Sequence, residues 1–111
     1  MISVAKGNKI VTLINVFSVD PANQQQLVDL LAQATTSSVR HMTGFVSASL
    51  HRSLDGTKVA MYAQWRSIKA YNAMGQNNTA AHFFEKALAL AKFEPGMYEV
   101  SETFESDVKD A

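Results

Sequence analysis

The feature that most constrains this fold is an Asp55-Gly56 pair between two runs of alternating apolar and polar residues. Asp-Gly is typical of hairpin turns because these residues accept the positive φ angles that a tight turn requires. The sequence therefore predicts a β-hairpin over about residues 44–66. Side-chain alternation predicts two sets that each share a face, Phe45, Ser47, Ser49 and His51 on the first strand, and Val59, Met61, Ala63 and Trp65 on the second. One candidate face then carries a histidine, a tryptophan and small residues that leave space for a ligand.

The chain before the hairpin predicts one strand and one helix. Residues 9–19 alternate but are largely apolar on both faces, which indicates a strand covered on both sides. Asp20-Pro21 then predicts a helix start, with Asp20 as N-cap and proline at the first helical position. We expect this helix to fade through residues 35–38.

The chain after the hairpin predicts two helical segments and a last strand. Ser67 and Gly75 bracket a short helix, and Asn77 starts a longer one that Pro95-Gly96 breaks. Met97 to Phe104 alternates as a strand. A polar tail follows it, over residues 105–111.

This order of elements, βαββαβ, is the ferredoxin-like α+β plan, a four-stranded antiparallel sheet with helices on one face. A single domain over 1–111, with a core of about 9–104, fits the length. The uncovered face is expected to carry Ile14, Val16, Val46, Leu50, Tyr62 and Tyr98, or their neighbours. We therefore predict a homodimer in which two sheets pack face to face.

Composition limits the classes of partner that the chain is expected to bind. Ten basic residues balance ten acidic ones, so charge gives no case for nucleic acid or a membrane surface as partner. There is no cysteine, and no His, Asp or Glu set has metal-ligand spacing, so no metal is expected. The apolar run Ile10 to Phe17 alternates and contains Asn15, so it is interpreted as a strand rather than a leader, and the cytoplasm is the expected location.

The hairpin and its flanks resemble the antibiotic biosynthesis monooxygenase superfamily, whose members are dimeric α+β barrels. The resemblance covers about residues 9–104 and rests on Thr43-Gly44-Phe45, Ser47, His51, Asp55-Gly56-Thr57, Tyr62-Ala63-Gln64-Trp65, Ser67 and Ala70-Tyr71. Asp20-Pro21 and Tyr98-Glu99-Val100 also fit. The closest functional resemblance is to quinone-forming, cofactor-independent monooxygenases, which oxidise an anthrone-like phenol with molecular oxygen.

The resemblance implies an aromatic small-molecule substrate, O2 as co-substrate and no cofactor. His51, Trp65 and Tyr71 match the pocket histidine, tryptophan and tyrosine of those enzymes. His51 would be the base or oxyanion partner, since it titrates near neutral pH. Trp65 and Tyr71 would orient the substrate, and the alternative for each is a place in the core, which the strand-end position of Trp65 favours. The pocket asparagine of the family falls on Met61, which has no hydrogen to donate.

Asn15 interrupts an otherwise apolar strand face between Leu13 and Phe17. A buried amide needs partners, so it either bonds the backbone or faces a wet cavity. In the second case Asn15 would replace the donor lost at Met61. We expect Phe17, Met61, Met74 and Phe83 to line the pocket between sheet and helices.

Two alternatives remain open. One branch of the superfamily binds and degrades haem. Asn15 fits its asparagine and His82 fits its histidine only with a gap, while its helical tryptophan falls near Met74. Taken by its position on the helix, His82 is instead a surface residue. The other alternative is a non-catalytic barrel that binds a small molecule.

Overall fold

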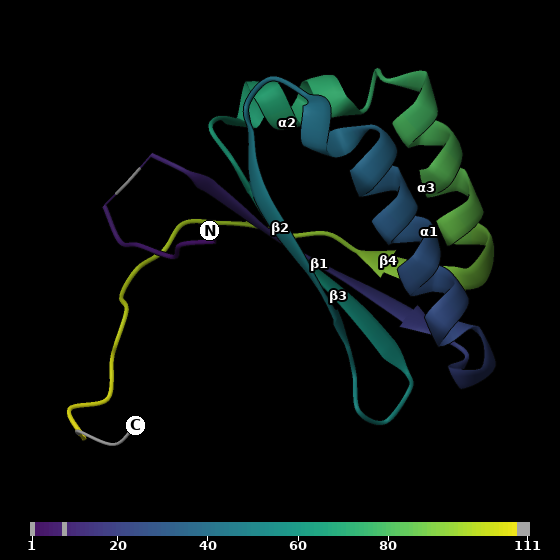
Figure 1. Cartoon of the computed structure of the whole chain (residues 1–111), viewed down its shortest axis with the longest axis horizontal. Coiled ribbons are helices and arrows are strands. Elements are labelled where there is room, and N and C mark those ends of the chain that lie inside the picture. Colours follow the sequence, from purple (N-terminus) through teal and green to yellow (C-terminus); the bar gives the residue numbers. More distant parts are fainter. Residues whose placement is uncertain (1, 8, 109–111) are drawn as a thin grey trace.

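The computed structural model describes residues 2–7 and 9–108, which form one antiparallel sheet with helices on one face (Figure 1). Its strands are β1 (Val11–Val19), β2 (Phe45–Arg52), β3 (Lys58–Trp65), β4 (Ala91–Glu94) and β5 (Met97–Tyr98). Its helices are α1 (Gln24–Ser37), α2 (Ile68–Met74) and α3 (Asn78–Leu90). The strand order is β2-β3-β1-β4, with β5 also paired to β1. The predicted ferredoxin-like α+β fold is confirmed.

The capping residues begin the helices where the sequence predicts. Asp20 accepts a hydrogen bond from the Ala22 N–H at 2.9 Å and opens a 3-10 turn over Pro21–Asn23, which leads into α1. Ser67 accepts from the Ala70 N–H at 3.0 Å, and Asn77 accepts from the Ala80 N–H at 3.0 Å. Each cap satisfies one amide that the first turn of a helix leaves without a partner.

The hairpin loop is longer than the two-residue turn that Asp55-Gly56 suggests, because β2 ends at Arg52 and β3 begins at Lys58. Gly56 has a positive φ of 82°, and its N–H donates to the Ser53 carbonyl at 3.2 Å. The Asp55 carboxylate accepts from the Thr57 amide at 3.0 Å and from the hydroxyls of Thr57 and Ser53 at 2.7 and 2.8 Å. These bonds favour the ionised form and lower the Asp55 pKa to about 2.

A β-bulge at the start of β2 overturns the predicted strand faces. Phe45 pairs with Trp65, but Ser47 pairs with Gln64, so Val46 is an extra residue in β2. Residues directly opposite on neighbouring strands share a face, and one extra residue shifts all that follow to the other face. His51 pairs with Ala60 and therefore lies on the face opposite Trp65. The expectation that His51 and Trp65 share a face is wrong.

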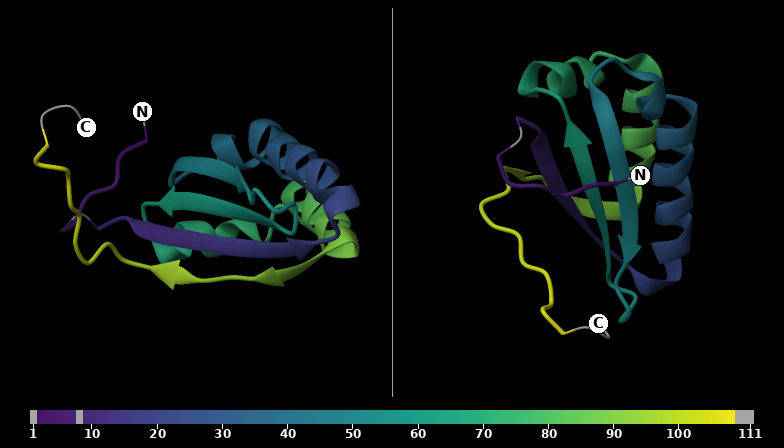
Figure 2. Two further views of the ribbon diagram at one scale, coloured as in Figure 1. Left: turned by 90° about the horizontal axis from the view of Figure 1, so that it is seen from below. Right: turned by 60° about the vertical axis from the view of Figure 1, so that its left-hand side comes forward.

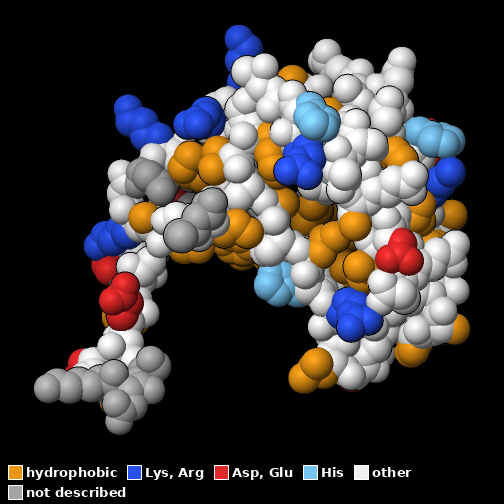
Figure 3. Space-filling model, viewed as in Figure 1, with side chains coloured by type: hydrophobic (Ala, Val, Ile, Leu, Met, Phe, Trp, Pro, Cys, Tyr) orange, Lys and Arg blue, Asp and Glu red, His pale blue; other side chains and the backbone are white. Residues whose placement is uncertain are grey.

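The C-terminal prediction also needs correction. Helix α3 ends at Leu90, before Pro95-Gly96, and the chain returns to the sheet at once as β4. Ala91 was expected on the apolar side of this helix, at helical spacing from Ala80 and Ala87, but it is the first residue of β4. The predicted strand Met97 to Phe104 is regular only as the two residues of β5. The following arm leaves the body, and its acidic side chains stand apart in the space-filling view (Figures 1 and 3).

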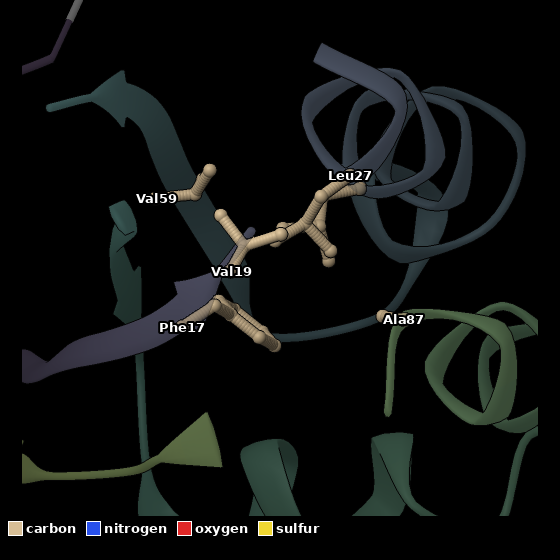
Figure 4. Packing of buried hydrophobic residues seen from close by; sticks show 6 residues of the cluster. Phe17, Val19, Leu27, Val59 and Ala87 are labelled. Atoms are coloured by element: carbon tan, nitrogen blue, oxygen red, sulfur yellow. The ribbon is translucent and has the colours of Figure 1, made fainter. Parts of the chain in front are cut away.

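The hydrophobic core lies between the sheet and the helices, all of which are on one side of it (Figure 2). Phe17, Val19 and Val59 on the strands pack against Leu27 of α1 and Ala87 of α3 (Figure 4). A second cluster, built around Leu13 and Trp65, sits toward α2. Burying a side chain such as Leu27, which is fully buried, contributes about 1.5–3 kcal/mol.

The opposite face of the sheet remains without a helix layer. Ile14, Val16 and Tyr62 are half-buried there, and Tyr98 is exposed. Leu50, expected on this face, instead pairs with Met61 on the helix side, again because of the bulge. At one end the Gln64 side chain donates to the Ser3 carbonyl at 2.7 Å, so the N-terminal segment covers part of this face. Among the described residues, no helix has the length and apolar character to cross a membrane.

Candidate active site

A cavity of about 450 Å³ lies between the sheet and the three helices. Its floor is the helix-side face of β1 and β3, and its walls come from α1, α2, α3 and Phe93 of β4. Most of the wall is apolar, with a few polar groups. That combination is typical of small-molecule sites, and the size lies in their usual range of about 300–1,000 Å³.

One end of the cavity is aromatic. Trp65, which is 1% exposed, meets Phe45 edge-on at a centroid distance of 5.4 Å and Tyr71 at 5.9 Å. All three side chains line the cavity. Burial raises the pKa of Tyr71 above its ordinary value, so its hydroxyl stays protonated at neutral pH. A flat aromatic ligand would therefore meet ring edges and faces together with one phenolic O–H at this end.

The floor of the cavity carries the amide of Asn15. Asn15 lies directly across from Met61 in the β1–β3 pairing, and both side chains line the cavity. Its Oδ1 accepts a hydrogen bond from the Gly96 N–H at 3.3 Å, and the Gly96 carbonyl in turn accepts from the Ile14 N–H at 3.0 Å. The bend at Pro95-Gly96, between β4 and β5, thus fixes the amide from behind.

This contact also sets which way the amide points. Because Oδ1 takes the bond from Gly96, the Nδ2 group must face away from it. Within the described residues Nδ2 donates to no protein atom, and it is not among the buried polar atoms without a partner. Because Asn15 lines the cavity, its amide is available there to donate to a ligand. Asn15 therefore both bonds the backbone and lines the cavity.

Glu85 is a cavity residue that the sequence analysis missed. It lies on α3 one helical turn after Ala81, and both line the cavity. The available signal was this i, i+4 spacing, which puts the two side chains on one face of the helix. Glu85 makes no hydrogen bond or ion pair with the other described residues. Thr35 also lines the cavity, but its hydroxyl is bonded to the Leu31 carbonyl at 2.9 Å.

Of the four apolar residues predicted to line the pocket, three line the cavity and one does not. Phe17, Met61 and Met74 line the cavity. Phe83 does not, and Phe84 takes that place, because the face of α3 that meets the sheet is centred on Ala80, Ala87 and Phe84. Phe84 contacts Phe93 edge-on at a centroid distance of 4.9 Å, while Phe83 contacts His82.

The histidines lie outside the cavity. His51 is exposed on the far face of the sheet, where Nε2 lies 2.9 Å from the Ser49 hydroxyl. His82 is exposed on α3, and His41 contacts the Thr36 carbonyl at 3.1 Å. The cavity wall therefore offers no imidazole from the described residues, and the histidine on which the haem alternative depends is not in place. Within the same residues no cluster of His, Asp or Glu has metal-binding geometry.

Taken together, the cavity can hold a flat apolar ring system, orient it on Trp65 and Tyr71, and stabilise negative charge on a ligand oxygen through the Asn15 amide. It supplies one tyrosine hydroxyl and one carboxylate as its titratable groups among the described residues. Such a donor in an apolar pocket is the arrangement that stabilises an oxyanion.

Residues 10–86 match the family described as "Antibiotic biosynthesis monooxygenase". The chain is 38% identical over 104 residues to tetracenomycin-F1 monooxygenase of Streptomyces glaucescens, covering 94% of this chain and 93% of that protein.

Two solved structures share the fold. The monooxygenase from the gene ActVA-Orf6 of Streptomyces coelicolor, in complex with nanaomycin D, has a TM-score of 0.78 and 30% identity, covering 87% of this chain and 92% of that one. SnoaB, a cofactor-independent oxygenase from Streptomyces nogalater, has a TM-score of 0.74 and 23% identity, covering 88% and 99%.

Proposed function

The chain belongs to the antibiotic biosynthesis monooxygenase family, and on that premise we propose that it is a cofactor-independent monooxygenase that oxidises an anthrone-like polycyclic phenol to a quinone. The relative named tetracenomycin-F1 monooxygenase and the relative bound to nanaomycin D support a polycyclic aromatic ligand. The 450 Å³ apolar cavity supports a ligand of about that size.

The proposed reaction needs no external reductant. An anthrone that loses a proton from its CH2 group becomes an electron-rich anion with charge on the ring oxygen. This anion passes an electron to O2, and recombination forms a carbon–oxygen bond as a hydroperoxide. Loss of water then gives the quinone. The balance is anthrone plus O2 to anthraquinone plus H2O, in which the carbon is oxidised and both oxygen atoms are reduced.

The observation that carries this proposal is the Asn15 amide, held by Gly96 and open to the cavity beside Met61. Hydrogen bonds to charged groups contribute about 1.5–3 kcal/mol. At about 1.4 kcal/mol for each pKa unit, one such bond to the anion lowers the pKa of a bound anthrone by about one to two units. We assign the oxyanion role to Asn15 rather than to His51, which lies on the other face of the sheet.

Trp65 and Tyr71 are proposed to orient the ring system at the aromatic end. Their positions leave the floor of the cavity, with Asn15, for the ring oxygen. Phe17, Met61 and Met74 exclude water around it, which strengthens the bond between the amide and the anion.

The test is oxygen uptake with 1,8-dihydroxyanthrone, corrected for uncatalysed oxidation and run on metal-free protein in the presence of a chelator. We expect saturable uptake, one O2 for each quinone, and one 18O atom in the quinone when 18O2 is supplied. Uptake no faster than the uncatalysed reaction across a panel of anthrones and quinols, despite binding, would instead indicate the non-catalytic alternative.

We also propose that the working unit of this single domain is a homodimer that covers the open face of the sheet. Ile14, Val16 and Tyr62 are half-buried there without a helix layer, and Tyr98 is exposed. An apolar sheet face without cover is typical of an interface. Light scattering at micromolar concentration is expected to give twice the chain mass of 12.2 kDa, and a single monomeric species would refute the dimer.

A further inference from the structure

The bend that holds the Asn15 amide lies at the edge of the sheet, between β4 and β5, and both of these short strands pair with β1 (Figure 2). The Gly96 N–H donates to Asn15 Oδ1 at 3.3 Å, and the Gly96 carbonyl accepts from the Ile14 N–H at 3.0 Å. The first distance is longer than the usual range of about 2.7–3.2 Å, so a small movement of the bend breaks this bond. Whatever fixes the bend therefore also fixes the amide.

The ring of Tyr98 lies directly against Gly96. A Cβ added at Gly96 would be 2.5 Å from Cε1 and 2.7 Å from the hydroxyl oxygen of Tyr98, so the edge of the phenol fills the space that a side chain at position 96 would need. Tyr98 pairs with Thr12 and so lies on the open face of the sheet, away from the helices. The ring therefore covers the bend from the open face, while the Gly96 N–H bonds an amide that lines the cavity on the other face.

We propose that Tyr98 is a positioning residue for the reaction, because its ring holds Gly96 in the place from which the Gly96 N–H orients the Asn15 amide. This inference rests on the proposed function, in which Asn15 donates to the oxyanion. Tyr98 does not line the 450 Å³ cavity, and its hydroxyl makes no hydrogen bond with the other described residues. Its contribution is therefore the contact of the ring with the backbone, and not a polar group for the substrate.

The need for such a contact follows from the glycine itself. Glycine leaves the backbone freer than any other residue, so a glycine between two short edge strands has to be fixed by its surroundings. A larger residue at position 96 would restrict the backbone but would also displace the ring. The bend and the ring therefore form one unit, in which the glycine makes room for the aromatic side chain that holds it.

The expected loss is smaller than the loss from removing the amide itself. If the bend without the ring keeps the donor in place for about a tenth to a third of the time, kcat falls about three- to tenfold. The KM for the neutral anthrone should stay within about twofold, because the amide is proposed to bond the anion that forms during the reaction. Tyr98→Phe keeps the ring, so its kcat should also stay within about twofold of the wild-type chain.

The experiment is a double-mutant cycle of Tyr98→Ala with Asn15→Asp, followed by oxygen uptake with 1,8-dihydroxyanthrone. A positioning residue acts only through the group that it positions. Tyr98→Ala should therefore lower kcat about three- to tenfold in the wild-type chain and lower it no further in Asn15→Asp, which has no N–H donor to position. The cycle also separates positioning from assembly, since loss of the proposed dimer would lower kcat in both backgrounds.

Gly96→Ala tests the same contact from the other side. Its methyl group would displace the ring, which has room to turn because Tyr98 is 53% exposed, and the N–H at position 96 is kept. We expect the same fall in kcat as in Tyr98→Ala, and this variant decides the question if Tyr98→Ala does not fold. The matched control is Phe104→Ala, which removes an exposed aromatic ring from the same C-terminal segment and should leave kcat unchanged.

An unchanged kcat in the folded variant would overturn the inference. An equal fall from Tyr98→Ala with asparagine and with aspartate at position 15 would overturn it as well, because Tyr98 would then act by a route that does not pass through the amide. Both results leave the proposed function standing, since the wild-type chain still oxidises the anthrone. Uptake by the wild-type chain no faster than the uncatalysed reaction would instead refute the proposed function, and with it the role of Tyr98.

Discussion

Exchanging the side chains of Asn15 and Met61 gives the sharpest test of the proposed chemistry. The two residues are direct cross-strand partners on the cavity floor. The Cβ atoms of such partners are about 4.5–5.5 Å apart, so an amide at either position reaches much of the same space. We therefore expect Asn15→Met to lose the donor and the double exchange, Asn15→Met with Met61→Asn, to restore part of it.

The size of the loss can be worked from the Asn15 environment. Losing a hydrogen bond to an anion costs about 1.5–3 kcal/mol, which is about a 10- to 150-fold fall in kcat/KM. Values above that, typical of fully enclosed oxyanion holes, are not expected because Asn15 is only half-buried. Recovery of kcat/KM in the double variant should be incomplete, because Gly96 donates its hydrogen bond to the amide at position 15 and would not orient an amide at position 61.

Asn15→Asp separates loss of the N–H donor from loss of the hydrogen bond that the Gly96 N–H makes to this side chain. The aspartate keeps an acceptor for the Gly96 N–H but presents no N–H to the ligand and adds a like charge. Asn15→Leu removes both contacts and leaves the half-buried Gly96 amide without its acceptor, at a cost to folding of about 1 kcal/mol.

The assay is oxygen uptake with 1,8-dihydroxyanthrone, with urea unfolding run on every variant. Asn15→Asp should lose turnover at nearly unchanged stability. The reasoning is refuted if Asn15→Asp keeps kcat/KM within about threefold of the wild-type chain, well below the loss expected for a charged hydrogen bond. It is also refuted if the folded double variant is no faster than Asn15→Met.

Two further predictions concern the folded state. Gly44→Ala should lower the free energy of unfolding by about 2–4 kcal/mol, because φ is 88° and a Cβ would lie 2.4 Å from that of Ala70. Gly7 has a similar φ of 85° but open space around it, so Gly7→Ala should lower the free energy of urea unfolding by less. Equal losses in the two variants would show that the contact with Ala70 is not the cause. The Asp55 pKa of about 2 lies below its unfolded value, so its stabilisation is present above about pH 4 and disappears as pH falls toward 2. The stability difference between the wild-type chain and Asp55→Ala should therefore shrink over that range, and a constant difference would refute the assignment.

The elements were predictable from sequence because local signals mark them. Asp20, Ser67 and Asn77 cap helices through contacts within three residues, and the alternation of β3 matches its pairing. The end of α3 was not predictable in this way. Ala91 suits both the apolar side of the helix and a strand face, and what decides is the pairing of residues 91–94 with β1, whose residues lie more than seventy positions away.

Most residues of the site were predictable from the sequence, but the face of the sheet on which each one lies was not. Trp65, Tyr71, Met61 and Asn15 reach the cavity, but the extra residue Val46 turns His51 away from it. A bulge has no distinctive residue here, since Val46 fits a regular strand equally well. Glu85 escaped notice because one carboxylate on a helix surface looks like any solvated charge until the opposite wall is known.

The anchoring of Asn15 by Gly96 has a consequence for spectroscopy. The Gly96 amide proton bonds to the same side chain that presents the cavity's donor, and it lies in the edge segment between two short strands. Its hydrogen exchange and chemical shift therefore report how much of the time the donor is in place. Ligand that engages the Nδ2 group should slow exchange at this one backbone position, so a single resolved resonance would monitor occupancy and preorganisation without any label on the substrate.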